Sequence, residues 1–404
     1  MALAFIPSIS SSSSPPRFFT SPSPSSPSVH FYGSVGSNIS NSTTLLVKSS
    51  NLAAPESSRS SLDPGELYES CKTWRWRGHS INFLAKGNGP PLLLVHGFGA
   101  SIGHWRRNIG VLADGYTVYA IDLLGFGASD KPEGFSYTME TWAQLILDFM
   151  DEVVQKPTVL VGNSVGSLAC VIAASEPASR LVKGLVLLNC AGGMNNKAIV
   201  DDWRIKLLLP LLWLFDFLLR QRVIASALFE RVKQRENLKN VLLSVYGNKE
   251  AVDDDLVEII KKPADDEGAL DAFVSVVTGP PGPSPISLMP KISLPVLVLW
   301  GDQDPFTPLD GPVGKYFSSL PSQLPNINLY VLEGVGHCPH DDRPNLVHES
   351  TVSSVELRSD AEMEALEVTK SLIASDSFGG AVDWPETKSL QLVRHCMTTS
   401  VQLQ

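Results

Sequence analysis

The sequence lacks both the cysteine pattern of a disulfide or zinc framework and any long apolar run. Its five cysteines are scattered over 404 residues and form no C-x-x-C pair, which indicates a reducing compartment and no structural metal. No apolar stretch reaches the roughly 20 residues that span a bilayer. The formal net charge of -10 argues against a nucleic-acid partner, because too few cations remain to neutralise phosphates. We therefore expect a soluble or peripheral protein without nucleic acid.

Acidic residues are missing from the first 55 positions, and Glu56 is the first in the chain. This segment is rich in Ser and Pro, with Arg17 and Lys48 as its fixed positive charges. Such a composition cannot bury enough apolar surface to fold, and its Ser and Pro runs interrupt the apolar core of a secretory signal. The pattern is typical of a chloroplast transit peptide, so we expect residues 1–55 to be a disordered leader. A disordered tail that stays attached is the alternative.

The clearest catalytic pattern is a strand-to-helix turn around Ser164. Residues 159–161 form an apolar run typical of a buried strand. The next five, Gly162-Asn163-Ser164-Val165-Gly166, have the G-x-S-x-G spacing of a nucleophile elbow. The two glycines lack the Cβ atoms that would collide in so sharp a turn. The pattern predicts an exposed Ser164 hydroxyl on strained backbone, although five residues alone also fit an ordinary Gly/Ser turn.

A second loop, His96-Gly97-Phe98-Gly99, follows the apolar strand expected over residues 91–95. In serine hydrolases of the α/β type, a loop of this kind exposes a backbone N–H to the carbonyl oxygen of the substrate. The residue after the nucleophile supplies a second N–H. We therefore expect the backbone N–H groups of Phe98 and Val165 to form an oxyanion hole.

Strands and helices alternate on both sides of a long helical insertion. Strands are expected at 74–84 (a pair), 116–123 and 184–189, and helices after Thr138 and behind Ser164. This order predicts an α/β fold whose mostly parallel sheet is covered by helices on both faces. We divide the chain into a first core part (63–191), a helical cap (192–290), a second core part (291–349) and an atypical C-terminal tail (350–404).

The expected cap contains an apolar stretch over residues 207–219, interrupted by Pro210 and Asp216 and flanked by basic residues. It is too short to cross a bilayer. It suits a segment at a membrane interface or an apolar wall over an active site, and an ordinary buried helix is the alternative. Residues 261–285, rich in acids and then in Gly and Pro, are expected to be loops and a linker.

The expected acid and base follow two later strands. The strand at 295–300 leads into Gly301-Asp302-Gln303-Asp304, where the pattern Trp-Gly-x-x-Asp favours Asp304 and leaves Asp302 as its competitor. The strand at 327–332 leads into a glycine turn that ends in His337. The chain order Ser164, Asp304, His337 is the one expected for an α/β hydrolase.

These three side chains suit hydrolysis through an acyl-enzyme. A serine hydroxyl is a poor nucleophile at neutral pH and needs a base within hydrogen-bond reach. His337 would take its proton, while Asp304 would hold the imidazole tautomer and stabilise the imidazolium. No metal or organic cofactor is required by this chemistry.

Four motifs in this order make the chain resemble the α/β-hydrolase superfamily from about Trp74 to Glu349. With the leader and the segment Asp122-Leu123-Leu124-Gly125-Phe126-Gly127, it is also similar to the plant enzymes called chlorophyll dephytylases and, more distantly, to pheophytinase. The resemblance implies catalytic roles for Ser164, Asp304 and His337. It also implies a chloroplast esterase, in the stroma or peripherally on the thylakoid membrane, that converts chlorophyll to chlorophyllide and phytol.

Two other functions fit the same residues. One is a plastid lipase or esterase acting on other long-chain esters such as galactolipids, and the other is a non-catalytic receptor on the hydrolase fold.

The chain departs from the superfamily after the histidine loop, where a helix normally packs on the sheet. Residues 344–347 could begin that helix, but 348–354 are polar and rich in Ser, and a second candidate helix lies at 360–375.

Overall fold

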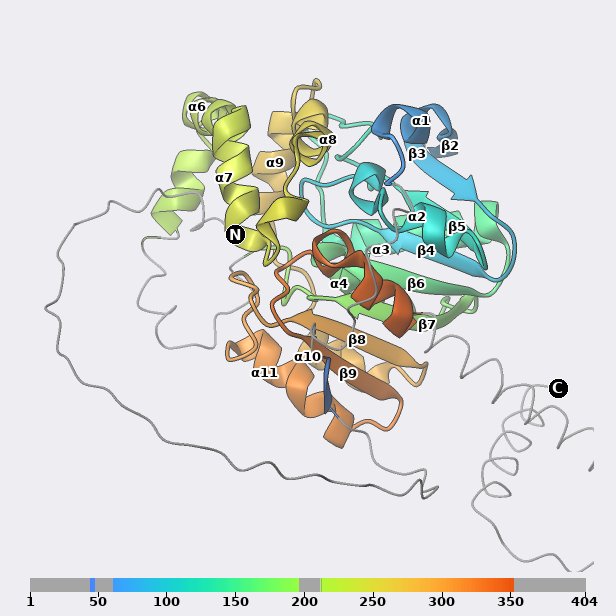
Figure 1. The fold of residues 1–404 in the computed structure, drawn as a ribbon. Helices are drawn as coiled ribbons and strands as arrows, with labels where there is room; N and C mark the ends of the chain where they lie inside the picture. The colour runs from blue at the N-terminus through green and yellow to red at the C-terminus, as the bar shows by residue number, and fades with distance from the viewer. Residues whose placement is uncertain (1–43, 48–60, 196–210, 212, 352–404) are drawn as a thin grey trace, which may run out of the picture. The chain divides into compact units, whose positions relative to one another are not determined.

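The computed structural model describes residues 44–47, 61–195, 211 and 213–351. The chain divides into two units, 1–348 and 349–404, and the sheet belongs to the first. This sheet has nine strands in the order β1-β9-β8-β7-β6-β4-β5-β3-β2 (Figure 1). Only the pairs β2–β3 and β3–β5 are antiparallel. The predicted α/β fold with a mostly parallel sheet is therefore confirmed.

The central strands are apolar on both faces. Every residue of β4 and of β8 is buried, as expected for parallel strands that helices cover on each side. The strands are β1 (Thr44–Val47), β2 (Lys72–Trp76), β3 (His79–Lys86), β4 (Pro91–Val95), β5 (Thr117–Ile121), β6 (Thr158–Asn163), β7 (Val182–Leu188), β8 (Val296–Gly301) and β9 (Ile327–Leu332).

Two long helices cover the middle of the sheet. Helix α4 (Val165–Ser175) lies on β6 and β7 and packs against α3 (Met139–Phe149). Thr138 caps α3, because its side chain accepts a hydrogen bond from the backbone N–H of Thr141. The remaining helices of the core are short: α1 (Pro64–Glu69), η3 (Ile102–Trp105), α2 (Ile109–Leu112), η4 (Met150–Val154), α10 (Pro285–Leu288), η7 (Met289–Lys291), α11 (Pro312–Ser319), η8 (Leu320–Ser322) and α12 (Pro339–Asp342).

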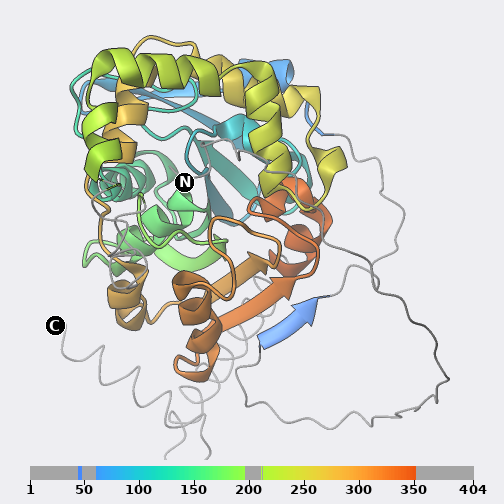
Figure 2. The ribbon, with the colours of Figure 1, turned by 90° about the vertical axis from the view of Figure 1, so that its left-hand side faces the viewer.

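The cap is helical, and its helices gather on one side of the strands (Figures 1 and 2). The expectation of loops over residues 261–285 was wrong for 261–264 and 269–278, because α8 extends to Ala264 and α9 fills 269–278. Residues 279–284 are not helical and form the expected linker back to the core. Buried apolar residues recur at helical spacing in α9, namely Ala269, Ala272, Phe273 and Val276. Their burial stabilises the helix in spite of the acidic residues nearby. The cap helices are α6 (Arg222–Val232), α7 (Arg235–Val245), η6 (Lys249–Ala251), α8 (Asp254–Ala264) and α9 (Ala269–Thr278).

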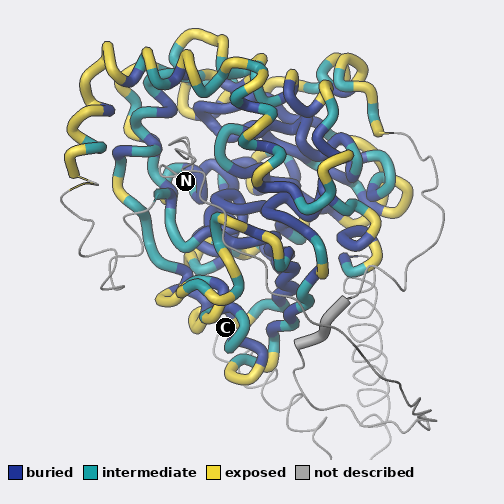
Figure 3. The backbone as a smooth tube through the Cα atoms, turned by 60° about the vertical axis from the view of Figure 1, so that its left-hand side comes forward, coloured by how far each residue is buried: buried dark blue, intermediate teal, exposed yellow. Residues whose placement is uncertain are grey.

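The described part of the apolar stretch at 207–219 is helical at residues 211 and 213–219, and the remainder lies outside the described residues. Leu211, Trp213 and Phe217 are 54%, 74% and 60% exposed, and exposed positions follow the outer cap helices in Figure 3. The alternative of an ordinary buried helix was therefore wrong for these side chains.

A strand lies inside the expected leader. Residues Thr44–Val47 form β1, which pairs in parallel with β9 at the edge of the sheet. The expectation of disorder over all of 1–55 was therefore wrong for these four residues, because β9 offers backbone hydrogen-bonding groups to a short run of strand formers. Residues 1–43 and 48–55 lie outside the described residues.

The chain after α12 is helical again from 344 to 351, so the closing helix that the sequence suggested at 344–347 continues into the polar residues that follow. The second candidate helix, at 360–375, and almost all of the tail expected at 350–404 lie outside the described residues.

A buried polar cluster joins the cap to the core. Arg106, only 1% exposed, donates two hydrogen bonds of 2.9 and 2.8 Å to Asp253, which caps α8. Its Nε also lies 3.5 Å from Oδ1 of Asp341. Tyr246 donates to Asp341 at 3.0 Å, and its oxygen lies 2.7 Å from Nε2 of His104. A charge that loses its partner at such depth is strongly destabilising, so this cluster fixes where α8 begins.

The buried histidines predict acid sensitivity. Burial, and then the charge of Arg106, lowers the pKa of His104 to about 3, and burial lowers the pKa of His348 to about 4. Between these values and the unfolded pKa of roughly 6.5, the unfolded state binds more protons than the native state. Stability therefore falls as the pH drops below about 6.5.

In His104→Gln, the amide can still bond to Tyr246 but does not titrate. We expect the free energy of unfolding to fall less steeply than in the wild type, by about 1.4 kcal/mol per pH unit between roughly pH 6 and pH 4. Urea unfolding at several pH values measures both slopes. Parallel curves for the two proteins would contradict the low pKa of His104.

Candidate active site

Ser164 occupies a strained turn between β6 and α4. Its φ is +56°, a left-handed value that is uncommon for a residue with a side chain. A Cβ on Gly162 would lie 2.5 Å from Ser167 N, and one on Gly166 would lie 2.3 Å from the carbonyl oxygen of His96. Only glycine fits at these two positions, so the local sequence fixes the turn that presents the Ser164 hydroxyl.

The structure brings Ser164, Asp304 and His337 together. The Oγ of Ser164 lies 2.9 Å from Nε2 of His337, and Nδ1 of His337 lies 2.7 Å from Oδ2 of Asp304. The competing carboxylate, Asp302, instead accepts a hydrogen bond from the backbone N–H of Gly334 at 2.8 Å. This chain of hydrogen bonds can move a proton from a serine hydroxyl to an imidazole whose tautomer a carboxylate fixes.

Asp304 is held ionised by its surroundings. Burial by itself would raise its pKa, but the charge of His337 and hydrogen bonds from His337, Thr307 and the backbone of Phe306 lower the pKa to about 2. The amide of Asn189, directly after β7, also donates to Oδ2 of Asp304 at 2.8 Å. Sequence reasoning missed both Asn189 and Thr307. Thr307 could have been noticed as a hydroxyl three residues after Asp304.

The loop after β4 lies against the Ser164 turn. A Cβ on Gly97 would come within 3.3 Å of the Cβ of Ser164, so the next residue, Phe98, is beside the serine. Neither Phe98 N–H nor Val165 N–H has a backbone or side-chain acceptor among the described residues. His96 fixes the loop, because its Nε2 accepts from Leu123 N at 3.0 Å and its Nδ1 donates to Gly97 O at 2.7 Å. These contacts fit the predicted oxyanion hole.

The loop that carries His337 is held by two side chains that sequence reasoning also missed. The amide of Asn163 donates to the carbonyl oxygen of His337 at 3.0 Å. The buried carboxylate of Asp342 accepts from the backbone N–H groups of Gly336, Gly247 and Asn248 at 2.6, 2.7 and 2.7 Å. Asp342 thus ties the histidine loop to the end of α7. Asn163 is the second residue of the elbow motif, so the sequence did place it next to Ser164.

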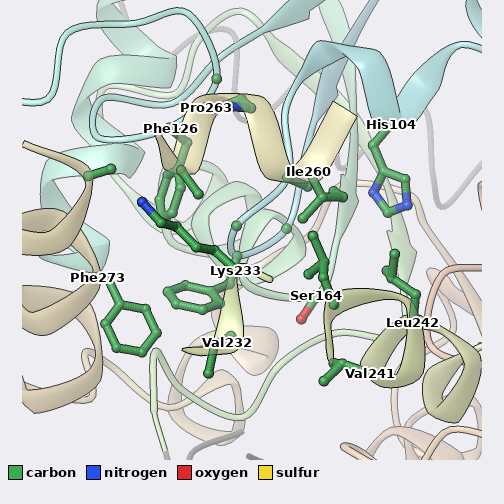
Figure 4. A pocket seen from close by; sticks show the side chains of 18 of the residues that line it. His104, Phe126, Ser164, Val232, Lys233, Val241, Leu242, Ile260, Pro263 and Phe273 are labelled. Carbon is green, nitrogen blue, oxygen red and sulfur yellow. The ribbon is translucent and has the colours of Figure 1, made fainter. Parts of the chain in front are cut away.

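A pocket opens over Ser164 between the core and the cap (Figure 4). Apolar side chains from α6, α7, α8 and α9 form most of its wall, and the exposed residues near 211–217 do not line it. Four polar or charged side chains besides Ser164 and His337 border it: His104, Lys131, Asn163 and Lys233. A wall of this kind suits a hydrophobic ligand that carries few polar groups.

The described residues contain no cluster of His, Cys, Asp and Glu that could hold a metal ion. In the same part of the chain, no helix is both long and apolar enough to cross a membrane.

Known proteins similar to this chain include hydrolases of bacteria and plants. An uncharacterised hydrolase of Bacillus subtilis, YugF, is 29% identical over 261 residues, covering 64% of this chain and 87% of that protein. The chloroplastic pheophytinase of Arabidopsis thaliana is 25% identical over 304 residues, which cover 65% of this chain and 60% of the pheophytinase. A 2-hydroxy-6-oxo-6-(2'-aminophenyl)hexa-2,4-dienoic acid hydrolase of Metapseudomonas resinovorans is 27% identical, over 70% and 90% of the two chains.

Solved structures share the fold. A serine hydrolase involved in carbazole degradation superposes with a TM-score of 0.56 at 23% identity, over 71% of this chain and 98% of that one. A membrane phospholipase A gives a TM-score of 0.54 at 24% identity, over 71% and 86%. The family model of the alpha/beta hydrolase fold matches residues 90–344, which is more than half of the chain and includes all three residues of the hydrogen-bonded chain. The protein therefore belongs to the α/β-hydrolase fold family and is a hydrolase.

Proposed function

We propose that this hydrolase is a serine carboxylic-ester hydrolase of the chloroplast that removes the phytyl chain from chlorophyll. The observation that carries the proposal is the continuous set of hydrogen bonds from Ser164 through His337 to Asp304. It lies at the floor of an apolar pocket, so the nucleophile and the hydrophobic surface are presented together.

In the acylation step, Ser164 Oγ attacks the ester carbon while its proton passes to Nε2 of His337. The carbonyl oxygen becomes an oxyanion beside the N–H groups of Phe98 and Val165, and each such donor contributes roughly 3–4 kcal/mol in comparable sites. The bond from carbon to the alcohol oxygen then breaks. The leaving alkoxide takes the proton from Nε2 of His337, and the acyl group stays on Ser164.

Deacylation uses the same groups with water as the nucleophile. His337 removes a proton from water as its oxygen bonds to the acyl carbon, and the bond from carbon to Oγ breaks. The proton returns to Ser164. Asp304, with its pKa of about 2, remains ionised through both steps and stabilises the imidazolium each time it forms.

Three features support a hydrophobic plastid ester such as chlorophyll, and the second favours a chlorophyll-type pigment. The pocket wall is apolar, as a long isoprenoid alcohol requires. The chain is similar to a protein named chloroplastic pheophytinase. The composition of residues 1–43, without acids and rich in Ser and Pro, suits import into a plastid.

Replacing Asp304 tests the roles of the three residues. We expect Asp304→Asn to lower kcat on 4-nitrophenyl butyrate by about 10³- to 10⁴-fold, because an amide stabilises the wrong tautomer of His337. The matched variant Asp302→Asn should keep kcat within about threefold, since Asp302 contacts the loop backbone and not the imidazole. Comparable losses in both variants would argue against the assignment of Asp304.

The substrate is tested by offering the full-length protein chlorophyll a, pheophytin a and a monogalactosyl diacylglycerol, each in detergent. We expect chlorophyllide and phytol from chlorophyll, with no product from Ser164→Ala. Chromatography of the pigments and free fatty acids measures all three reactions. Fatty acid release alone would favour a galactolipid lipase. No product, together with no labelling of Ser164 by a fluorophosphonate, would favour a non-catalytic receptor.

We also propose that the protein binds the thylakoid surface peripherally through an exposed apolar face made of Leu211, Trp213, Leu214, Phe217 and Val223. These side chains are 52–83% exposed, and Trp and Phe are typical of segments that lie in the lipid interface. Helix α6 begins within this face and lines the pocket with Phe229 and Val232. A protein docked in this way would hold its pocket next to lipid-dissolved substrate.

Vesicle flotation tests this contact. We expect the wild type to float with galactolipid vesicles and the double variant Trp213→Ser/Phe217→Ser to float at least about fivefold less, because it loses two large apolar side chains that the lipid interface would bury. Ile286→Ser is the matched control, since Ile286 is an equally exposed apolar residue (54%) on α10. Equal flotation of both mutant proteins would remove the proposed face as the binding surface.

A further inference from the structure

The wall of the pocket has two parts, called its halves below: one contains four phenylalanine rings, and the other is mostly aliphatic but includes the ring of Phe306. The aromatic half consists of Phe98, Phe126, Phe229 and Phe273, which all line the pocket. Their rings form a continuous row, with centroids 5.7 Å apart for Phe98 and Phe126, 6.0 Å for Phe98 and Phe273, and 5.1 Å for Phe229 and Phe273. Rings at such spacings favour edge-to-face and tilted contacts with a further aromatic ring. This half begins at Phe98, whose N–H belongs to the expected oxyanion hole.

The aliphatic half consists of Leu238, Leu242, Val245 and Ile260, from α7 and α8. These residues pack in one hydrophobic cluster with Cys338, the neighbour of His337 in the chain. Phe306 packs against the same cluster, and its ring meets that of His337 edge-on at 5.0 Å. This half therefore begins at His337.

The two halves lie on opposite sides of Ser164. In Figure 4, Phe126 and Phe273 lie on one side of the serine, and Leu242 lies on the other. Phe229 and Phe273 form a cluster against which Phe98 packs, and Phe126 belongs to the main core. Leu238 and Leu242 pack with Cys338 in a separate cluster.

The chemistry of the acylation step assigns one half to each part of the ester. The leaving alkoxide must come within hydrogen-bond distance of His337 Nε2 to take its proton, so the alcohol lies on the side of His337. The carbonyl oxygen occupies the oxyanion hole at Phe98, and the acyl substituent takes the remaining direction at the tetrahedral carbon. The acyl substituent therefore extends from the carbon along the side opposite the alcohol.

We propose that the aromatic half binds a flat, ring-containing acyl group and the aliphatic half binds a long aliphatic alcohol. The proposal rests on the proposed ester hydrolysis and adds its direction: an ester with the two groups exchanged is a poor substrate. Phe273 and Leu242 are then specificity-determining residues, one for each part of the ester.

Two isomers separate direction from hydrophobicity. Dodecyl 2-naphthylacetate and 2-naphthylmethyl tridecanoate have the same atoms and the same two groups, and they differ only in the orientation of the ester. We expect the full-length wild type to hydrolyse dodecyl 2-naphthylacetate with a kcat/KM about tenfold higher or more, a ratio typical of a matched apolar pocket. Equal values, or a preference for the tridecanoate, would overturn the assignment of the two halves.

Phe273→Leu keeps an apolar side chain but removes the ring. We expect it to lower kcat/KM about tenfold for dodecyl 2-naphthylacetate and less than about twofold for dodecyl hexanoate, whose acyl group has no ring. A variant that only loosened the fold would lower both values equally. That result would exclude a specificity role for Phe273.

Leu242→Trp fills the aliphatic half. Among the ethyl, octyl and dodecyl esters of 2-naphthylacetic acid, kcat/KM of the wild type should rise with chain length. In the variant we expect the gain for dodecyl over ethyl to be lost, so that the ratio of the two kcat/KM values falls towards one. A uniform loss for all three would place the alcohol elsewhere. If the wild type hydrolyses none of these esters and Ser164 does not react with a fluorophosphonate, the proposed ester hydrolysis itself fails. If the wild type hydrolyses the two naphthyl isomers equally well, only the assignment of the halves is refuted.

Discussion

The hydrogen bond between His337 and Ser164 joins residues that lie 173 positions apart in the chain, and the order of strands makes it possible. The carboxyl ends of parallel strands meet at one edge of a sheet. The four neighbouring strands β9, β8, β7 and β6 end, in turn, shortly before His337, Asp304, Asn189 and Ser164. Each strand thus brings one side chain to the same edge of the sheet. Because β6 and β9 are not neighbours, the loop after β9, which Asn163 and Asp342 hold, carries His337 back to Ser164.

This order explains why Asn189 belongs to the site although it takes no part in proton transfer. Its strand lies between those that carry the serine and the carboxylate, and its amide donates to Asp304 while its oxygen accepts from Gly301 N at 3.0 Å. Its side chain thus links the ends of β7 and β8 by hydrogen bonds. The positive φ of 43° at Asn189 shows backbone strain at this point, which the surrounding contacts maintain.

The sequence predicted those parts of the site that depend on local turn chemistry. Gly162 and Gly166 mark the elbow because only residues without a side chain fit so sharp a turn. A five-residue motif is enough to show this requirement. Asn189 could not be predicted in the same way, because its role depends on which strands are neighbours. The exposure of Trp213 was equally hidden, since an apolar helix looks the same whether its face meets the core or the solvent. Helix α9 was missed because acidic and glycine residues around it resemble a linker.

The attachments of the cap differ between its helices. Helix α8 is fixed before its start by the buried side chain of Arg106 bound to Asp253, and after its end by Lys131, 5% exposed, bound to Asp266. Helix α6 carries Arg222, which is 71% exposed and lies 3.8 Å from Glu133 in the segment before α3 and 3.4 Å from Asp271 of α9. Exposed pairs contribute little to stability, so the ion pairs of Arg222 hold α6 less firmly than the buried side chains of Arg106 and Lys131 hold α8. Apolar packing of Phe229 against Phe273 therefore carries more of the attachment of α6.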